Sequence, residues 1–373
     1  SFNVKNVTYQ FDDLNYGVCN INISENHGKL VGIMGASGAG KTTLLNLLAG
    51  IDKPTEGEVL INGIDLHKSS KELKGSLGYI PQDDLLIEEL TVYQNLYFSA
   101  KQSFNNKTED EIRELVFKTL RSLGLFGIRS LQVGSPLNKL ISGGQRKRLN
   151  IALELIREPS ILFVDEPTSG LSSRDSENVM DLLSELSLKG KLIFVVIHQP
   201  SSEIYKMFDK MVILDIGGYL VYYGNPVEAL VYFKKMDAQI NSEVGECPTC
   251  GNVTPELIFN ILEAQVVDEF GQYTQIRKTE PKRWAELYQE HIETQNYPDI
   301  KESPPTNLSI PSWLNQFKIY LSRDVLKKIA NTQYVLLTLL EAPLLGFILS
   351  FIIRYVEDPN TGDYIFRLND NIP

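Results

Sequence analysis

Between residues 35 and 42 the chain reads Gly-Ala-Ser-Gly-Ala-Gly-Lys-Thr, directly after the apolar run of residues 30–34. A strand that leads into a glycine-rich turn and then a helix is the P-loop arrangement. Its small residues let backbone N–H groups close around a polyphosphate, and the helix N-terminus adds positive potential. Lys41 supplies charge to the terminal phosphates, and the Thr42 hydroxyl can join a Mg²⁺ shell. The predicted phosphate-binding residues are Gly35, Ala36, Ser37, Gly38, Ala39, Gly40, Lys41, Thr42 and Thr43.

Length and charge narrow the class of protein. The 373 residues suffice for about two domains. The net charge of −11 argues against nucleic acid as the main partner, because duplex binding normally needs a basic face. Three cysteines, Cys19, Cys247 and Cys250, are too few for a disulfide framework, which favours a reducing compartment.

Several stretches have the patterns of β-strands. Continuous apolar runs at 161–164 and 192–197 are typical of parallel strands buried on both faces. Residues 3–9 alternate as a half-buried strand does. An Asn-Gly pair within 59–66, and a Gly-Gly pair between 211–214 and 220–223, predict two hairpins. The pattern predicts an α/β P-loop NTPase core with an antiparallel β subdomain.

Residues from about 88 to 157 are helical in pattern instead. Thr108 followed by Glu111 forms a capping box. Apolar residues then recur at helical spacing from Ile112 to Leu123. We therefore expect an α-helical subdomain inserted into a nucleotide-binding domain of residues 1–236.

The region after this domain changes in composition. Residues 237–311 are polar and broken by prolines, which predicts a linker or accessory region with short helices such as Arg283–Ile292. Residues 312–333 form an amphipathic connecting helix with interleaved basic residues. Two interpretations of this helix stay open: it lies at the membrane surface, or it packs on the nucleotide-binding domain.

An apolar segment at 334–354 is long enough to cross a bilayer core of about 30 Å. The basic residues Lys318, Arg323, Lys327 and Lys328 precede it, so the positive-inside bias places the N-terminal bulk in the cytoplasm. Glu341 within the span marks either a functional position or a helix contact. Residues 355–373 are expected to begin a non-cytoplasmic loop of a longer membrane protein.

Five further motifs follow the P-loop in a fixed order. Gln82 lies in Gly-Tyr-Ile-Pro-Gln-Asp-Asp at 78–84, and Ile-Ser-Gly-Gly-Gln-Arg-Lys-Arg occupies 141–148. Four apolar residues precede Asp165 and Glu166, and Ser-Gly-Leu-Ser follows at 169–172. A final strand ends in His198-Gln-Pro. Taken singly most of these motifs are weak, but their joint order and spacing are specific.

Residues 1 to about 236 resemble the nucleotide-binding domain of ABC transporters. The resemblance sharpens to the G subfamily, the eye-pigment, sterol and multidrug exporter group. It rests on Gln-Asp-Asp at 82–84, on Gly-Gly-Gln-Arg-Lys-Arg at 143–148 running on to Glu-Leu-Ile at 154–156, and on Ile-His-Gln-Pro at 197–200. Residues 142–145 are the family's signature motif. A nucleotide-binding domain that precedes the membrane span is also typical of that subfamily. The stretch from Cys247 to Pro255 is only loosely similar to the corresponding subfamily region.

The resemblance and the chemistry of phosphoryl transfer imply the same roles. Asp165 would hold Mg²⁺, with Thr42 and Gln82 near the same ion. Glu166 would polarise the attacking water as general base, and His198 would contact the γ-phosphate. The signature residues begin a helix whose N–H groups form an anion hole, which by resemblance serves the ATP of a partner domain. The partner-site residues are Ser142, Gly143, Gly144 and Gln145.

Three positions leave alternatives or doubts. Phe11 lies where the family places an aromatic ring on adenine, and Tyr9, Tyr16 or a plain core role are alternatives. Ser172 stands where the family usually has Asp, which puts coupling between the two sites in doubt. Cys247 and Cys250 have zinc-type spacing but lack two further ligands, so a metal site, a redox pair and a plain linker turn remain open.

The sequence therefore predicts the ATPase part of an ABC half-transporter, an exporter by resemblance, with ATP and Mg²⁺ as cofactors. Its expected partners are a second nucleotide-binding domain, identical or from a sibling half, and the membrane. A soluble ABC ATPase acting on ribosomes or DNA would show tandem P-loops or a coiled-coil insertion. An importer ATPase would lack a covalent span. The segment at 334–354 argues against both alternatives.

Overall fold

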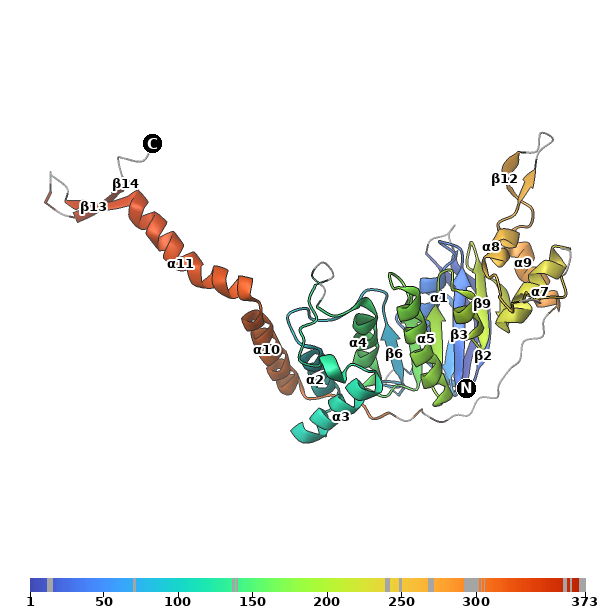
Figure 1. Ribbon diagram of the computed structural model, residues 1–373, viewed down its shortest axis with the longest axis horizontal. Helices are drawn as coiled ribbons and strands as arrows, with labels where there is room; N and C mark the ends of the chain where they lie inside the picture. The colour runs from blue at the N-terminus through green and yellow to red at the C-terminus, as the bar shows by residue number, and fades with distance from the viewer. Residues whose placement is uncertain are drawn as a thin grey trace.

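The computed structural model describes most of the chain (Figure 1). The described residues are 1–11, 16–69, 72–135, 138, 140–238, 242–247, 250–267, 272–291, 302, 304, 306–357, 361–362 and 364–368. Their central feature is a ten-stranded sheet in the order β5-β4-β1-β2-β10-β9-β3-β8-β7-β6.

The sheet has a parallel half and an antiparallel half. In the parallel half, β3 lies between β9 and β8, and β8 continues through β7 to β6. In the other half, β1 pairs antiparallel with β2 and β4, and β4 with β5. The predicted combination of a P-loop core with an antiparallel β subdomain is confirmed. The strands are β1 Phe2–Gln10, β2 Tyr16–Glu25, β3 Lys29–Gly35, β4 Glu56–Ile61, β5 Ile64–Asp65, β6 Leu77–Ile80, β7 Ile161–Asp165, β8 Leu192–Val196, β9 Lys210–Asp215 and β10 Tyr219–Gly224.

The apolar runs form the centre of the core, as their composition requires. Every residue of β7 and β8 is buried, because helices cover both faces of a parallel sheet. The rings of Phe163 and Phe194 stack with centroids 5.5 Å apart on these adjacent strands. The P-loop helix α1 (Lys41–Ala49) packs against β7 and β8, and α5 (Ser173–Leu188) packs against β8 and β3. The strand ends that carry Asp165 and His198 are therefore held on a rigid frame.

Both predicted hairpins are present. Asn62 and Gly63 have φ of 50° and 79° between β4 and β5, which is the left-handed geometry that favours an Asn-Gly turn. Gly217 and Gly218 likewise have positive φ between β9 and β10.

The helical region forms a hydrophobic cluster of its own. It contains α2 (Val92–Ser103), α3 (Glu109–Ser122), the 3₁₀ turn η1 (Phe126–Ile128) and α4 (Gly143–Leu155). The predicted capping box of Thr108 and Glu111 begins α3. Buried side chains from Leu86 to Ile156 pack with one another, separately from the cluster around the sheet. This segment thus has the internal packing of a subdomain.

The segment expected as a linker packs on the core over much of its described length. After α7 (Pro226–Met236) come α8 (Glu256–Leu262), the β11–β12 hairpin (Gln265–Val267 and Tyr273–Arg277) and α9 (Pro281–His291). Ile258 and Trp284 are almost fully buried in the main cluster. Arg277 binds Asp215 with Nη1–O distances of 2.9 and 3.0 Å. Apolar residues spaced between the prolines make this packing possible.

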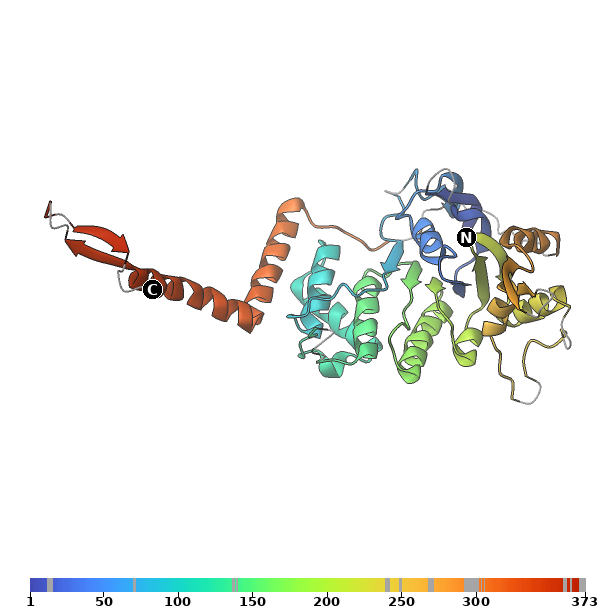
Figure 2. The ribbon, with the colours of Figure 1, turned by 90° about the horizontal axis from the view of Figure 1, so that it is seen from above.

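Two long helices lead away from the sheet (Figures 1 and 2). The connecting helix α10 (Trp313–Ala330) contacts α2, and α11 (Thr332–Ile352) follows it almost directly. One candidate membrane span, Thr332–Ser350, is found in the described residues, and none of it is buried. Its exposed apolar surface is unlike that of a core helix. In the segment expected to begin a non-cytoplasmic loop, β13 (Ile353–Glu357) and β14 (Tyr364–Leu368) pair as a hairpin.

Candidate nucleotide site

The P-loop joins β3 to α1, as predicted. Gly40 caps α1 with φ of 87°, and a Cβ there would lie 2.0 Å from the carbonyl oxygen of Gly17. Only glycine tolerates both the left-handed backbone and this close approach. Lys41 is 9% exposed, and its Nζ donates to the carbonyl oxygens of Gly35 (3.0 Å) and Ala36 (2.9 Å). The ammonium therefore lies within the loop that it is expected to complete.

The electrostatics of Lys41 favour an anionic ligand. Burial lowers the pKa of the ammonium, and the nearby carboxylates of Glu166 and Asp165 oppose this shift. A buried cation gains most from a partner that brings negative charge and further hydrogen-bond acceptors. A polyphosphate supplies both.

Asp165 closes β7 with a buried carboxyl group that lacks a full set of partners. Burial raises its pKa, and a hydrogen bond from the Thr42 side chain opposes the shift. Its Oδ1 has no hydrogen-bond partner among the described residues. Two oxygen-bearing side chains at one point, one with an orphaned oxygen, fit a hard divalent cation such as Mg²⁺. No cluster of three or more His, Cys, Asp or Glu side chains suited to a metal occurs in the described chain. A Mg²⁺ ion here would take its remaining oxygens from Thr42, Gln82, water and phosphate.

Glu166 adopts a strained backbone conformation next to Asp165. Its φ is 42°, and its N–H donates to the carbonyl oxygen of Val196 at 3.1 Å. A non-glycine residue at positive φ costs about 1–3 kcal/mol and is typical of functional sites. Gln82 Nε2 donates to Glu166 Oε2 at 3.1 Å, so the predicted ligand and the predicted base are in contact.

His198 lies exposed after β8 and lines a cavity of about 210 Å³ with Gly35, Ala36 and Ser37. Sequence reasoning missed the other wall of this cavity. That wall is α8 and the residue after it, which contribute Glu256, Phe259, Asn260 and Glu263. Pro255 and Glu256, followed by the apolar residues 257–259, were the available helix-start signal.

The signature residues begin α4. Ser142 caps the helix, with its hydroxyl accepting from the N–H of Gln145 (3.1 Å) and the Gln145 side chain accepting from the Ser142 N–H (2.9 Å). The helix runs from Gly143 to Leu155, so it begins within the signature, as expected. Gly143 and Gly144 form its first turn.

Ser172, which stands where an Asp was expected, caps α5. Its hydroxyl accepts from the Asp175 N–H (3.2 Å) and donates to the Asp175 carboxylate (3.0 Å). A Cβ on Gly144 would lie 2.5 Å from Asp175 Oδ1, so this turn touches the signature helix of its own chain.

Phe11 lies next to the P-loop helix. A Cβ on Gly17 would approach the Phe11 ring to 2.7 Å and Thr43 Cγ2 to 3.1 Å. The ring is 63% exposed and meets Tyr9 edge-on at 5.1 Å. Of the alternatives for stacking on adenine, Phe11 presents an exposed face, whereas the Tyr16 side chain lies outside the described residues.

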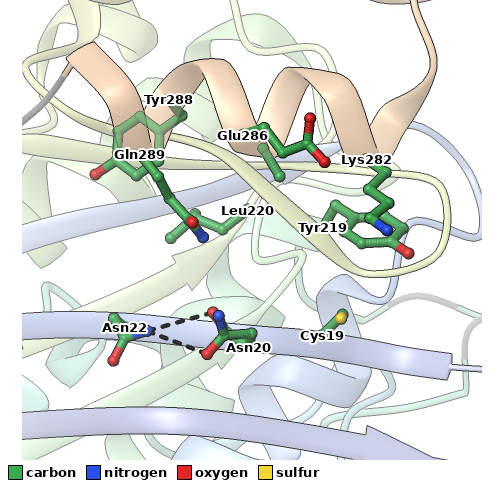
Figure 3. A pocket seen from close by; sticks show the side chains of 10 residues that line it. Cys19, Asn20, Asn22, Tyr219, Leu220, Lys282, Glu286, Tyr288 and Gln289 are labelled. Carbon is green, nitrogen blue, oxygen red and sulfur yellow. Dashed lines mark hydrogen bonds between the residues drawn. The ribbon is translucent and has the colours of Figure 1, made fainter.

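A cavity of about 540 Å³ lies elsewhere, between β2, β10 and α9 (Figure 3). Asn20 and Asn22 of β2 face Lys282, Glu286 and Gln289 of α9 across it. None of the predicted nucleotide residues lines it.

Comparison with known proteins agrees with this geometry. A family model described as ABC transporter matches residues 18–169, and one described as ABC-2 type transporter matches residues 198–292. Residues 18–169 therefore form an ATP-binding domain of the ABC transporter family. The relatives of this chain are of the G-subfamily type. The chain is 32% identical to Protein white of Drosophila melanogaster, over 87% of this chain and 48% of that protein. It is 42% identical to the broad substrate specificity ATP-binding cassette transporter ABCG2 of Bos taurus, over 54% of this chain and 30% of that protein.

A solved structure carries the same fold. A dimeric ATP-binding cassette, MJ0796, in a post-hydrolysis state bound to ADP and Pi, has a TM-score of 0.52 and 29% identity. The match covers 61% of this chain and 99% of that one. The chain spans 48% of the length of Protein white and 30% of the length of the Bos taurus transporter. This chain therefore combines an ABC ATPase domain with a helix that is long and apolar enough to cross a membrane.

Proposed function

We propose that this chain is the ATP-binding and ATP-hydrolysing part of an ABC half-transporter. The observation that carries the proposal is the convergence of Lys41, Asp165 and Glu166 after the carboxyl ends of β3 and β7, the two strands that flank β8, with Gln82 in contact with Glu166. A phosphate cradle, an orphaned carboxylate oxygen and a polar pair at one place are what phosphoryl transfer to water requires.

The roles of the residues follow from their positions. Residues 35–43 cradle the phosphates through backbone N–H groups, and Phe11 stacks on the adenine. Asp165, Thr42 and Gln82 hold Mg²⁺, which when bound neutralises charge on the β- and γ-phosphates. Glu166 accepts a proton from the attacking water, and the Gln82 amide fixes the orientation of its carboxylate. His198, which lines the same cavity as Ser37, contacts the γ-phosphate.

The signature residues Ser142, Gly143, Gly144 and Gln145 serve the nucleotide of a second ABC domain. The first turn of α4 offers backbone N–H groups to an anion, and the helix dipole adds to the attraction. The solved relative MJ0796 is described as dimeric, which supports this arrangement. ATP then binds two domains together, and hydrolysis releases them.

The helical region passes this motion towards the membrane. Near the end of α10, Lys327 Nζ lies 3.9 Å from Glu89 Oε2, and Asn331 Nδ2 donates to Glu89 Oε1 at 3.5 Å just before α11. Glu89 precedes α2, which α10 contacts. The nucleotide-binding domain lies on the cytoplasmic face, in keeping with the basic residues before the span. In this proposal the nucleotide-binding domain ends at residue 236, the linker region at 311, the connecting helix at 333 and the membrane span at 354.

Replacing Glu166 by Gln tests the proposal. In the membrane-reconstituted full-length protein, Glu166→Gln should bind ATP normally but hydrolyse it at least ~10²-fold more slowly, because positioned proton transfer is lost. Phosphate release and equilibrium ATP binding are measured side by side. Glu203→Gln, an exposed carboxylate on α6 (Ser202–Lys206), is the matched control. Near-normal hydrolysis by Glu166→Gln would remove the general base from the mechanism.

A further inference from the structure

The loop that carries Gln82 is fastened to α4 at three points. Arg146 makes a two-point ion pair with Asp84, with Nε–Oδ2 at 2.6 Å and Nη2–Oδ1 at 3.1 Å. The Lys147 ammonium donates to the carbonyl oxygen of Gln82. The Leu85 N–H donates to Asn150 Oδ1 at 3.3 Å. These three contacts come from successive turns of α4. Any movement of α4 is therefore transmitted to the loop that carries Gln82.

The Arg146 contact is buried and directional. Arg146 is 7% exposed and also donates through Nη1 to the carbonyl oxygen of Gly134 at 2.5 Å. A bidentate guanidinium–carboxylate pair fixes both distance and orientation, which a lysine in its place would not do. The loop is therefore held at Asp84, two residues after Gln82.

Lys147 lies in the field of the catalytic carboxylates. Burial lowers the pKa of its ammonium, and Asp84, Asp83, Glu166 and Asp165 act in the opposite direction. Its hydrogen bond holds the main chain of Gln82, while the Gln82 side chain donates to Glu166. The backbone of Gln82 is thus bound by α4, and its side chain is hydrogen-bonded to Glu166.

We propose that Arg146 and Lys147 are positioning residues that hold Gln82 against Glu166. This inference rests on the proposed role of Glu166 as general base. In this proposal neither Arg146 nor Lys147 contacts the nucleotide. Both residues act by fixing the loop that carries Gln82. Losing them lets Gln82 drift from Glu166, which lowers the rate of the chemical step and leaves the P-loop intact. A misplacement of about 1 Å in such a site costs on the order of 10²-fold in rate.

The principal test uses Lys147→Met, which keeps the stem of the side chain and removes the charge. In the membrane-reconstituted full-length protein, kcat for ATP hydrolysis should fall at least ~10-fold, with ATP affinity unchanged. Lys147→Arg should recover most of the rate, because it restores a donor to the Gln82 carbonyl. Lys118→Met, an exposed lysine on α3, is the control and should match the parent protein.

A readout independent of activity is hydrogen exchange in the nucleotide-free protein. Amides of residues 82–86 should exchange faster in Lys147→Met than in the parent or in Lys118→Met, while those of β7 are unchanged.

Arg146→Gln removes one member of a buried ion pair and can unfold the protein. Asp84→Asn is therefore the second variant, and it should also lower kcat without changing ATP affinity.

The outcomes separate the two claims. If Glu166→Gln hydrolyses ATP normally, the proposed function fails. If Glu166→Gln is impaired but Lys147→Met keeps the parental kcat or the parental exchange at 82–86, only the positioning role is overturned. A weakened ATP affinity in Lys147→Met, with kcat unchanged, would also overturn it, because that result places Lys147 at the nucleotide.

Discussion

The buried carboxylate of Asp165 suits a cationic ligand but lowers the stability of the protein when that ligand is absent. Its carboxyl group is buried, with one oxygen left without a partner. Because its pKa is raised, the folded chain binds this proton more tightly than the unfolded chain does. At a pH above the ordinary carboxyl range, the ionised side chain therefore lowers the free energy of unfolding. The same charge is what a divalent cation needs.

Asp165→Asn should consequently stabilise the nucleotide-free protein while it abolishes the response to ligand. We expect a Tm rise of about 2 °C without ligand, for a gain of about 1 kcal/mol. The additional rise that Mg²⁺ and ATP give the parent should be lost. Thermal unfolding with and without Mg·ATP measures both effects. Asp181→Asn on the exposed face of α5 should change neither, and a lower Tm for Asp165→Asn without ligand would contradict the explanation.

Helix capping shows, at the scale of an element, what local sequence can predict. The box at Thr108 and Glu111 is recognisable from residue spacing alone, and the structure contains it. Thr108 Oγ1 accepts from the Glu111 N–H at 3.3 Å, and Glu111 Oε2 accepts from the Thr108 N–H at 2.7 Å. Such a contact depends only on residues three apart in the chain.

Thr108→Ala should loosen the beginning of α3. Loss of an N-cap costs about 1 kcal/mol, so the hydrogen-bonded amides at this helix end, those of Glu111 and Ile112, should exchange about 5-fold faster. Thr119→Ala on the same helix is the control. Its hydroxyl donates to the carbonyl oxygen of Leu115 and caps no N–H group. Equal exchange in both variants would show that the box does not hold the helix end.

Other elements could not be predicted because their contacts join distant parts of the chain. The strands, hairpins and P-loop follow from short-range patterns, and the order of the motifs indicated which side chains meet. The packing of α8 beside His198 depends on how the roughly 60 residues between them fold. The polar composition of residues 237–311 gave no sign of this packing. The ion pair between Arg146 and Asp84 joins two residues that lie 62 positions apart in the sequence. Nothing in local spacing specifies such a pair.

At the scale of the whole molecule, α11 stands apart from the packed cassette (Figure 1). Leu339 and Leu344 are 68% and 60% exposed, as apolar side chains are when their solvent is lipid. The cassette has two hydrophobic clusters of its own, so it has no need of this helix for its core.

The chain of residues 1–373 should therefore stay with membranes after alkaline extraction through α11. Replacing both Leu339 and Leu344 by Arg should release it, because each charge near a bilayer centre costs about 2.5–3.5 kcal/mol. Leu188→Arg, at an 83% exposed site on the cassette, should leave the fractionation unchanged. Retention of the double variant would assign membrane attachment to another segment.

The two tasks of α4 have a genetic consequence. In the proposed pair its first turn would face a neighbour's nucleotide, while Arg146 and Lys147, which follow that turn, hold the loop of its own site. A defect in this helix would be felt on both sides of the pair, even where the second subunit is sound. In a cell that makes normal and altered copies together, a substitution here should behave as dominant, whereas a lesion confined to Phe11 should spare the neighbouring half.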